Sequence, residues 1–229
     1  MFSLLTPSFM KTPLTGSAPI GEFANRIIQG DCITVMQKMP ARSVDFVVTD
    51  PPYIVSYRSR DGKSIANDDN SRWLQPAFQQ VYRVLKDDSF CVCFYGWNRI
   101  GRFMDAWRSA GFYPVGHFAA VKHYASRSGF TRACHESAYL LAKGRPSKPT
   151  SPPSDILPWH YSGNRLHPTQ KPVITLHPLI QSYSKAGDIV LDPFSGSGTT
   201  AVAARQLGRR YIGIELNSKH CAVAQSRRE

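Results

Sequence analysis

The sequence has no long apolar run, few acidic residues and no paired set of cysteines. No stretch approaches the 18 consecutive apolar residues typical of a transmembrane helix, so we expect no membrane span. Asp and Glu together number 16 against 28 Lys and Arg, which gives a formal net charge of +12. Such a charge favours polyanionic partners, with nucleic acid first and an anionic membrane surface second.

The five cysteines are odd in number and scattered, which is typical of reduced thiols in the cytoplasm rather than of a disulfide framework. Cys91 and Cys93 form a CxC pair inside an apolar run that is typical of a strand, where alternation places both on one face. Because no second pair completes a zinc site, we expect both to be buried core thiols and predict no bound metal.

The length of 229 residues and the hydrophobic content of 42% are sufficient for one sizeable core but not for two full domains. Residues 1–24 contain three prolines, two glycines and many Ser and Thr, which predicts a flexible N-terminal arm. We therefore expect a single folded domain over residues 25–229.

Strand and helix signals alternate along this domain and predict an α/β fold with a mostly parallel, doubly wound sheet. Between Pro146 and Pro172 lie 7 of the 17 prolines, so this stretch is expected to be extended and irregular. The predicted strands are 26–29, 44–49, 89–95, 115–121, 137–141, 188–191 and 210–215, and the predicted helices are 33–38, 73–85, 100–110, 173–184, 199–207 and a last one from 218.

A glycine-rich turn follows the predicted strand 188–191, in the sequence DPFSGSGTT at 192–200. The glycines permit close approach of a ligand to the backbone, and the helix that follows presents free N–H groups. Glu215 ends the next strand, where a carboxylate can accept both hydroxyls of a ribose. This pattern indicates an adenine nucleoside cofactor and fits NAD about as well as S-adenosylmethionine.

A second motif, Asp50-Pro51-Pro52-Tyr53, directly follows the predicted strand 44–49. Strand ends are where ligands bind in a doubly wound sheet. The two prolines stiffen the backbone and remove two N–H donors, which leaves the Asp50 carboxylate and the Pro51 carbonyl as a rigid pair of acceptors beside an aromatic ring. This arrangement suits a planar base that carries an amino group, with Tyr53 stacked on the ring.

DPPY followed by DPFSGSGTT, with HPTQKP at 167–172, resembles the S-adenosylmethionine-dependent DNA amino-methyltransferases over about residues 25–229. The motif order is similar to that of their permuted beta group, which is typified by adenine-specific (N6) enzymes. The resemblance implies a Rossmann-like class I methyltransferase fold with circularly permuted motif order. It further implies S-adenosylmethionine as cofactor, S-adenosylhomocysteine as product, double-stranded DNA as substrate, a cytoplasmic location and a possible homodimer.

The resemblance also implies roles for single residues. Asp31 and Cys32, after Gly30, would reach the adenine of the cofactor, Glu215 its ribose, and the turn from Asp192 to Gly196 its methionine part. Thr169 and Lys171 would contact its carboxylate. The full set of implied cofactor positions is Asp31, Cys32, Asp50, Thr169, Lys171, Asp192, Phe194, Ser195, Gly196, Ser197, Gly198, Thr199, Thr200, Glu215 and Asn217.

The catalytic residues implied are Asp50, Pro51, Pro52 and Tyr53. Hydrogen bonds from an exocyclic amino group to the first two would make its nitrogen more nucleophilic and stabilise the charge that develops there. The target base lies inside a duplex and must be flipped out, and Tyr53 would replace some of its lost stacking. A carbon-5 cytosine enzyme would need a cysteine nucleophile, usually after proline, and no Pro-Cys occurs.

The DNA-contact segment is expected at about residues 122–166. From Lys122 to Lys171 there are eight Lys and Arg against two acids, Glu136 and Asp155, with aromatic residues interleaved. Basic residues contact phosphates and make binding dependent on salt. The candidate DNA-binding residues are Lys122, Arg127, Arg132, Lys143, Arg145, Lys148 and Arg165.

The leading hypothesis is a site-specific DNA adenine-N6 methyltransferase, and four alternatives remain open. Cytosine-N4 enzymes more often carry Ser at the position of Asp50. Protein glutamine methyltransferases typically carry Asn there and have the glycine loop first. A nicotinamide-dependent oxidoreductase would leave DPPY and the basic segment unexplained. A non-catalytic DNA-binding protein of the same fold would not need an intact Asp50–Tyr53 motif and Glu215.

Overall fold

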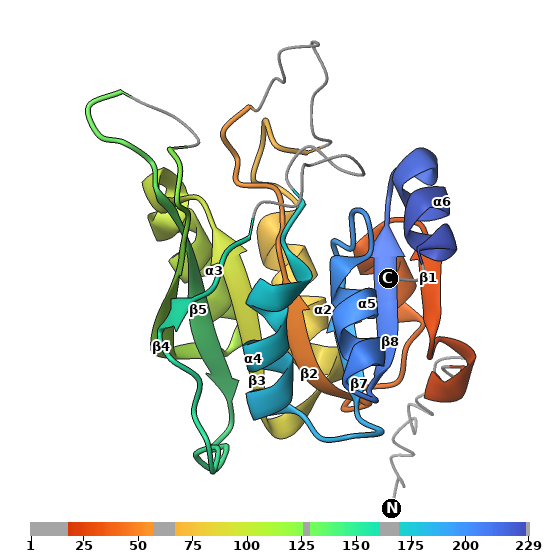
Figure 1. Ribbon diagram of the computed structural model, residues 1–229. Helices are drawn as coiled ribbons and strands as arrows, with labels where there is room; N and C mark the ends of the chain where they lie inside the picture. Colours follow the sequence, from red (N-terminus) through yellow and green to blue (C-terminus); the bar gives the residue numbers. More distant parts are fainter. Residues whose placement is uncertain (1–17, 57–66, 126–128, 161–169, 228–229) are drawn as a thin grey trace, which may run out of the picture.

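The structure is a computed structural model that describes residues 18–56, 67–125, 129–160 and 170–227. Its centre is a sheet of eight strands in the order β1-β8-β7-β2-β3-β5-β4-β6 (Figure 1). The strands are β1 (Arg26–Gln29), β2 (Val44–Thr49), β3 (Leu85–Tyr95), β4 (Tyr113–Val121), β5 (His135–Lys143), β6 (Ile156–Leu157), β7 (Ile189–Asp192) and β8 (Arg210–Glu215). All seven predicted strands are present, and only the two-residue β6 was not predicted.

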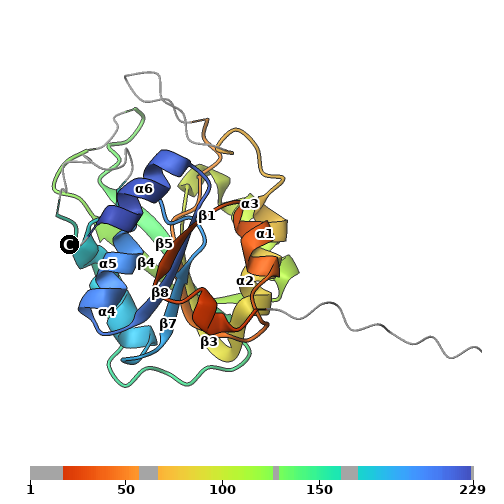
Figure 2. The same ribbon diagram turned by 90° about the vertical axis from the view of Figure 1, so that its right-hand side faces the viewer.

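Helices cover both faces of this sheet, as a doubly wound fold requires (Figure 2). On one face lie α1 (Cys32–Gln37), α2 (Leu74–Val84) and α3 (Ile100–Ala110); on the other lie α4 (Val173–Tyr183), α5 (Thr199–Gln206) and α6 (Ser218–Ser226). Two short 3-10 turns are η1 (Ile20–Glu22) and η2 (Trp97–Arg99). The predicted α/β class and the six predicted helices are confirmed.

Alternate residues of β3 face two separate cores, because successive side chains of a strand point to opposite faces. Cys91 and Cys93 are both fully buried in the core under α1, α2 and α3, whereas Val92 and Phe94 belong to the core under α4 and α5. Both thiols are therefore core residues, as predicted.

Residues 1–17 lie outside the described part, but Ile20 and Phe23 pack against the first core. The predicted arm consequently ends before residue 24.

Two strands from opposite ends of the chain meet at the centre of the sheet. β2 pairs in parallel with β7, with Phe46 opposite Val190 and Val47 opposite Leu191. This pairing brings together the motif after β2, which comes first in the chain, and the glycine loop after β7, which comes last. Parallel pairing places both strand ends at the same edge, so Asp50 and Asp192 become neighbours in the fold.

One strand of the sheet runs against the others. β5 is antiparallel to both β3 and β4, whereas the remaining pairs are parallel. Its first residues, His135 and Glu136, therefore lie beside the carboxyl ends of the parallel strands. Its last residue, Lys143, pairs with Ser89 at the opposite edge. The direction of β5 therefore places its first residues, and not its last, near a site at the carboxyl edge of the parallel strands.

Candidate active site

A cavity of about 550 Å³ opens at the carboxyl edge of β1, β2, β7 and β8. This volume lies within the range of ordinary small-molecule sites. All four residues of the DPPY motif line it, as does every described residue of the predicted cofactor set except Gly198. Thr169 lies outside the described residues. The cavity also has lining residues that the sequence did not single out, among them Asp68, Trp73, Glu136, Gln170, Lys219 and His220.

The glycine loop after β7 is tied to the end of β8 by Glu215. One carboxylate oxygen of Glu215 accepts from the backbone N–H of Gly196 and the other from that of Asn217, both at 2.8 Å. Gly198 adopts a positive φ of +80°, and a Cβ there would lie 2.9 Å from the Cβ of Ala224 in α6. Glycine is therefore required at this position both for backbone conformation and for space.

Asp192, the last residue of β7, is only 4% exposed and lies at the base of the cavity. One carboxylate oxygen accepts from the Thr49 hydroxyl at 2.9 Å and from the backbone N–H of Phe194 at 3.1 Å, and the other accepts from the Thr200 hydroxyl at 2.6 Å. Burial raises the pKa of Asp192 to about 6, although these hydrogen bonds favour its charged form.

The opposite wall comes from β1 and α1. Asp31 is the N-cap of α1, and its side chain accepts from the backbone N–H of Thr34 at 3.0 Å. Cys32 is buried beside it, and burial raises the pKa of its thiol to about 12, so the thiol stays neutral. Trp73 and Phe194 pack edge to face with ring centroids 5.1 Å apart and close the apolar part of the cavity.

The turn after DPPY is strained and held in place by hydrogen bonds. Ile54 is β-branched, yet it has φ +60°, a conformation that such residues rarely adopt. Its N–H donates to the buried Asp68 carboxylate at 2.7 Å, and its carbonyl accepts from the Arg99 guanidinium at 3.0 Å. These contacts hold the strained turn in one conformation and thereby fix the orientation of Tyr53.

Lys171 contacts the DPPY motif and lines the cavity, and its predicted contact with the carboxylate of the cofactor stays a prediction. Its buried ammonium forms an ion pair with one oxygen of Asp50, lies 2.8 Å from Glu136 and donates to the Tyr53 hydroxyl at 3.2 Å. An ammonium has three hydrogens, and these three oxygens take all of them. Lys122 adds a second cation, 2.5 Å from the other oxygen of Glu136.

The charges of Glu136 and Lys171 stabilise one another, whereas burial raises the pKa of Asp50 above its ordinary value despite the ion pair with Lys171. Burial alone would raise the pKa of Glu136, but Lys171 and Lys122 outweigh it and lower the value to about 2. Burial alone would lower the pKa of Lys171, but Asp50 and Glu136 raise it above its ordinary value. Burial raises the pKa of Tyr53 well above its ordinary value, so the ring stays a neutral phenol.

Three buried polar atoms that line this cavity have no hydrogen-bond partner. They are Oδ1 of Asp50, Oε1 of Gln170 and Oγ of Ser195. Leaving a buried acceptor without a partner is costly, so such atoms in a cavity indicate groups that a ligand satisfies. Asp50 is the one of the three that belongs to the rigid acceptor pair of DPPY. Among the described residues, no cluster of His, Cys, Asp and Glu is arranged to hold a metal ion.

Comparison with known proteins agrees with this geometry. The sequence pattern of the N6_N4_Mtase family, described as DNA methylase, matches residues 44–226. The chain belongs to this family of DNA methyltransferases. It is 55% identical over 203 residues to "Putative methylase YubD" of Escherichia coli (strain K12), which covers 89% of each chain. It is 28% identical to "DNA adenine methyltransferase YhdJ" of the same organism, over 93% of this chain and 86% of the relative.

Solved structures show the same class I, Rossmann-like fold as this DNA methyltransferase. The crystal structure of the M1.HpyAVI-SAM complex superimposes with a TM-score of 0.69 over 87% of this chain and 96% of that chain, at 24% identity. The cytosine-N4-specific PvuII DNA methyltransferase superimposes with a TM-score of 0.72 over 86% and 83%, at 19% identity. At such identities the likeness concerns the fold.

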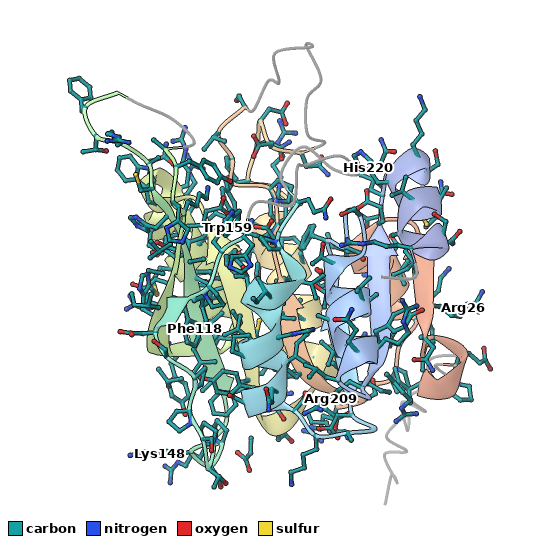
Figure 3. The ribbon with its side chains drawn as sticks, viewed as in Figure 1. Arg26, Phe118, Lys148, Trp159, Arg209 and His220 are labelled. Atoms are coloured by element: carbon teal, nitrogen blue, oxygen red, sulfur yellow. The ribbon has the colours of Figure 1, made fainter. Side chains whose placement is uncertain are left out.

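The predicted DNA-binding residues of this methyltransferase do not lie together. Lys143 is buried, donates to the carbonyls of Tyr82 and Leu85 and pairs with Asp87, so it is not available to a phosphate. Arg145 and Lys148 follow it at the amino edge of the parallel strands, and Figure 3 shows Lys148 at the opposite end of the sheet from His220. The antiparallel direction of β5 is the reason; the prediction for Lys143 is corrected, and those for Arg145 and Lys148 stay predictions.

The remaining basic residues divide into three kinds. Lys122 is buried in the Glu136 ion pair and lies 4.8 Å from the centroid of the Trp159 ring, so its prediction as a phosphate contact is also corrected. Arg132 is exposed in the connection between β4 and β5, at the cavity edge of the sheet. Arg127 and Arg165 lie outside the described residues.

In the part of the chain that the structure covers, no helix is long and apolar enough to cross a membrane.

Proposed function

We propose that this DNA methyltransferase is adenine-specific and transfers a methyl group from S-adenosylmethionine to the exocyclic N6 of a flipped adenine in double-stranded DNA. The family comprises both N6 and N4 enzymes, so the choice of base is the part that goes beyond it. The unpartnered Oδ1 of Asp50, a buried acceptor at the cavity wall, supports transfer to an exocyclic amino group, and the aspartate at this position supports the choice of adenine.

The residues around the cavity fit S-adenosylmethionine, which supplies an electrophilic methyl group on a sulfonium when bound. The Glu215 oxygens each keep a free lone pair after accepting one backbone N–H, which suits the two hydroxyls of a ribose. Trp73, Phe194 and Cys32 form an apolar wall for an adenine, with Asp31 at its edge. Ser195 Oγ, which has no partner, suits the polar methionine end.

The DPPY motif would bind the target base on the other side of the same cavity. Oδ2 of Asp50 is taken by Lys171, so Oδ1 and the Pro51 carbonyl are left to accept the two amino hydrogens. A pair of acceptors favours the pyramidal nitrogen and stabilises the positive charge that it gains on attack. After transfer the nitrogen releases one proton, which the Asp50 carboxylate can accept and pass to water at the cavity mouth.

DNA would approach from the carboxyl edge of the sheet, where the flipped base enters. Phe130 and Arg132 lie there in the β4–β5 connection; the Phe130 side chain is fully exposed to solvent, and Arg132 is exposed as well. An exposed aromatic ring beside a cation can stack on bases and contact phosphate. We therefore assign the DNA contacts to this connection and not to the basic residues after β5.

Asp at the first position of the motif supports adenine over cytosine, because N4 enzymes more often carry Ser there. The relative YhdJ is named a DNA adenine methyltransferase, which supports the same choice. A cytosine-N4 reaction uses the same pair of acceptors and is the alternative that the experiment must separate.

The test is a transfer assay with labelled S-adenosylmethionine and unmethylated duplex DNA, followed by mass spectrometry of the nucleosides. We expect 6-methyladenine from the wild type and none from Asp50→Ala, while the exposed Asp105→Ala in α3 keeps the wild-type rate. A 4-methylcytosine product would overturn the assignment of the base. Absence of any methylated base, with salt-sensitive DNA binding retained, would place the protein in the non-catalytic class.

A further inference from the structure

The Lys171 cluster joins four segments that are far apart in the sequence. Asp50 follows β2, Lys122 follows β4, Glu136 lies at the start of β5, and Lys171 precedes α4. The links are Asp50 to Lys171, Lys171 to Glu136 and Glu136 to Lys122. Two carboxylates and two ammonium groups give this chain of ion pairs a net charge of zero.

A lysine beside Asp50 presents an electrostatic problem for methyl transfer. The acceptor nitrogen uses its lone pair to form the new N–C bond, while the methyl–sulfur bond breaks and its electron pair stays on sulfur. The nitrogen gains positive charge before it releases its proton. An uncompensated ammonium on the far oxygen of Asp50 would oppose that charge, and in a buried site such an interaction is weakly screened.

Glu136 is placed to cancel this opposition. Its Oε2 lies 2.8 Å from the Lys171 ammonium and accepts from the Tyr53 hydroxyl at 3.2 Å, so it contacts both Lys171 and the last residue of the DPPY motif. Its Oε1 is held by Lys122, whose side chain is 5% exposed. Glu136 is fixed from both sides and fixes Lys171 in turn.

We propose that Glu136 is a positioning residue for methyl transfer, which neutralises Lys171 and holds it against Asp50, and that Lys122 attenuates this effect from the end of β4. The inference rests on the proposed function. It also gives Lys122 a role at the reacting centre in place of a phosphate contact. Lys122 and Glu136 lie at the two ends of the β4–β5 connection, to which we assign the DNA contacts. Their ion pair therefore links this connection to the catalytic motif through Lys171.

The charge argument ranks the variants of this cluster. Glu136→Gln leaves the cluster with a net charge of +1 and should slow transfer. Lys122→Met leaves it at −1 and should keep or raise the rate. The double variant returns to zero and should therefore be faster than Glu136→Gln alone. A purely structural role predicts instead that these variants lose folding stability, or affinity for cofactor and DNA, together with the rate.

The measurement is the single-turnover rate of methyl transfer at saturating S-adenosylmethionine and DNA, with the dissociation constants of both determined separately. We expect Glu136→Gln to lose 10-fold to 1,000-fold in rate with less than a 3-fold change in either dissociation constant, and the double variant to regain at least 5-fold. Lys86→Met is the matched control, because Lys86 pairs with Asp45 at the amino edge of the sheet, remote from the cavity. It should keep the wild-type rate.

A pH profile gives a second readout. The groups that face Lys171 are Asp50, Glu136 and the Tyr53 hydroxyl, with Lys122 behind Glu136. Removing the charge of Glu136 removes part of the attraction that raises the pKa of Lys171, so the variant should lose this proton at lower pH. The rate of Glu136→Gln should then rise more steeply toward alkaline pH than that of the wild type.

Three outcomes would overturn the proposal. One is a wild-type rate for Glu136→Gln, and another is a double variant no faster than that single variant. If Glu136→Gln does not fold, as judged by circular dichroism, a loss of more than 10-fold in Lys122→Met is the third. A wild type that methylates no base would instead refute the proposed function, and with it the role assigned here.

Discussion

Asp192→Asn should change the stability of the protein by an amount that depends on pH. The Asp192 carboxyl is buried, and its pKa is raised from the ordinary 3.8 to about 6. The folded state therefore keeps this proton at pH values where the unfolded state has lost it. Stability falls as pH rises from about 4 to 6 and stays lower above that range. A shift of two units corresponds to about 3 kcal/mol.

Asparagine has no proton to lose, so this dependence disappears in the variant. The loss of acceptors for Thr49 and Thr200 is a cost that does not depend on pH in this range. We therefore expect the free energy of unfolding of Asp192→Asn, relative to the wild type, to rise by about 2–3 kcal/mol between pH 4 and pH 7.5.

Urea unfolding without cofactor, at half-unit steps of pH, measures this difference. Asp105→Asn serves as the control, because Asp105 is exposed on α3, and its difference from the wild type should stay flat. A difference for Asp192→Asn that changes by less than about 0.5 kcal/mol over the range would refute the reasoning. Burial would then not be the force that acts on this carboxyl.

Three further predictions concern the two ligand-binding motifs. Glu215→Gln should raise the dissociation constant of S-adenosylmethionine about 10-fold or more, since a hydrogen bond to a charged group contributes about 1.5–3 kcal/mol; an unchanged constant in calorimetry would contradict the ribose assignment. Gly198→Ala should lower the free energy of unfolding by about 1–3 kcal/mol because of its φ of +80°, whereas Gly101→Ala, with no atom within 4 Å of a new Cβ, should raise it by about 0.5–1 kcal/mol. Equal effects of the two in thermal unfolding would count against that account. Gly96→Ala would place a Cβ 2.9 Å from the Cβ of Tyr53. We expect it to lower the transfer rate at least 10-fold while the affinity for the cofactor is retained. Loss of cofactor affinity alone would show that Tyr53 does not face the base.

The cofactor side of the site could be predicted because its residues are local in the chain. The turn at 192–200 and Glu215 belong to one strand–helix–strand unit, and the spacing of glycines and acid reports their geometry directly. The predicted strands and helices rest on hydrophobic periodicity, which has the same local character. β6 could not be predicted because a strand of two residues is too short to show an alternation of apolar and polar side chains.

The DNA side could not be predicted as well, because periodicity does not reveal the direction of a strand. Residues 135–143 give the same alternation whether β5 runs parallel or antiparallel to its neighbours. The antiparallel course brings Glu136 to the cavity and takes Lys143 to the far edge. The contact between Lys171 and Asp50 joins residues 121 positions apart and had no signal in either motif.

The pairing of β2 with β7 has a consequence for dividing the protein into two chains. A break in the irregular stretch between β5 and β6 would leave Asp50 on one fragment and the glycine loop with Glu215 on the other. Neither fragment would hold both a base acceptor and a cofactor loop, and β7 and β8 would insert between β1 and β2 only when the fragments associate. If each fragment were fused to one of two partner proteins, DNA would be methylated only where those partners bring the fragments together.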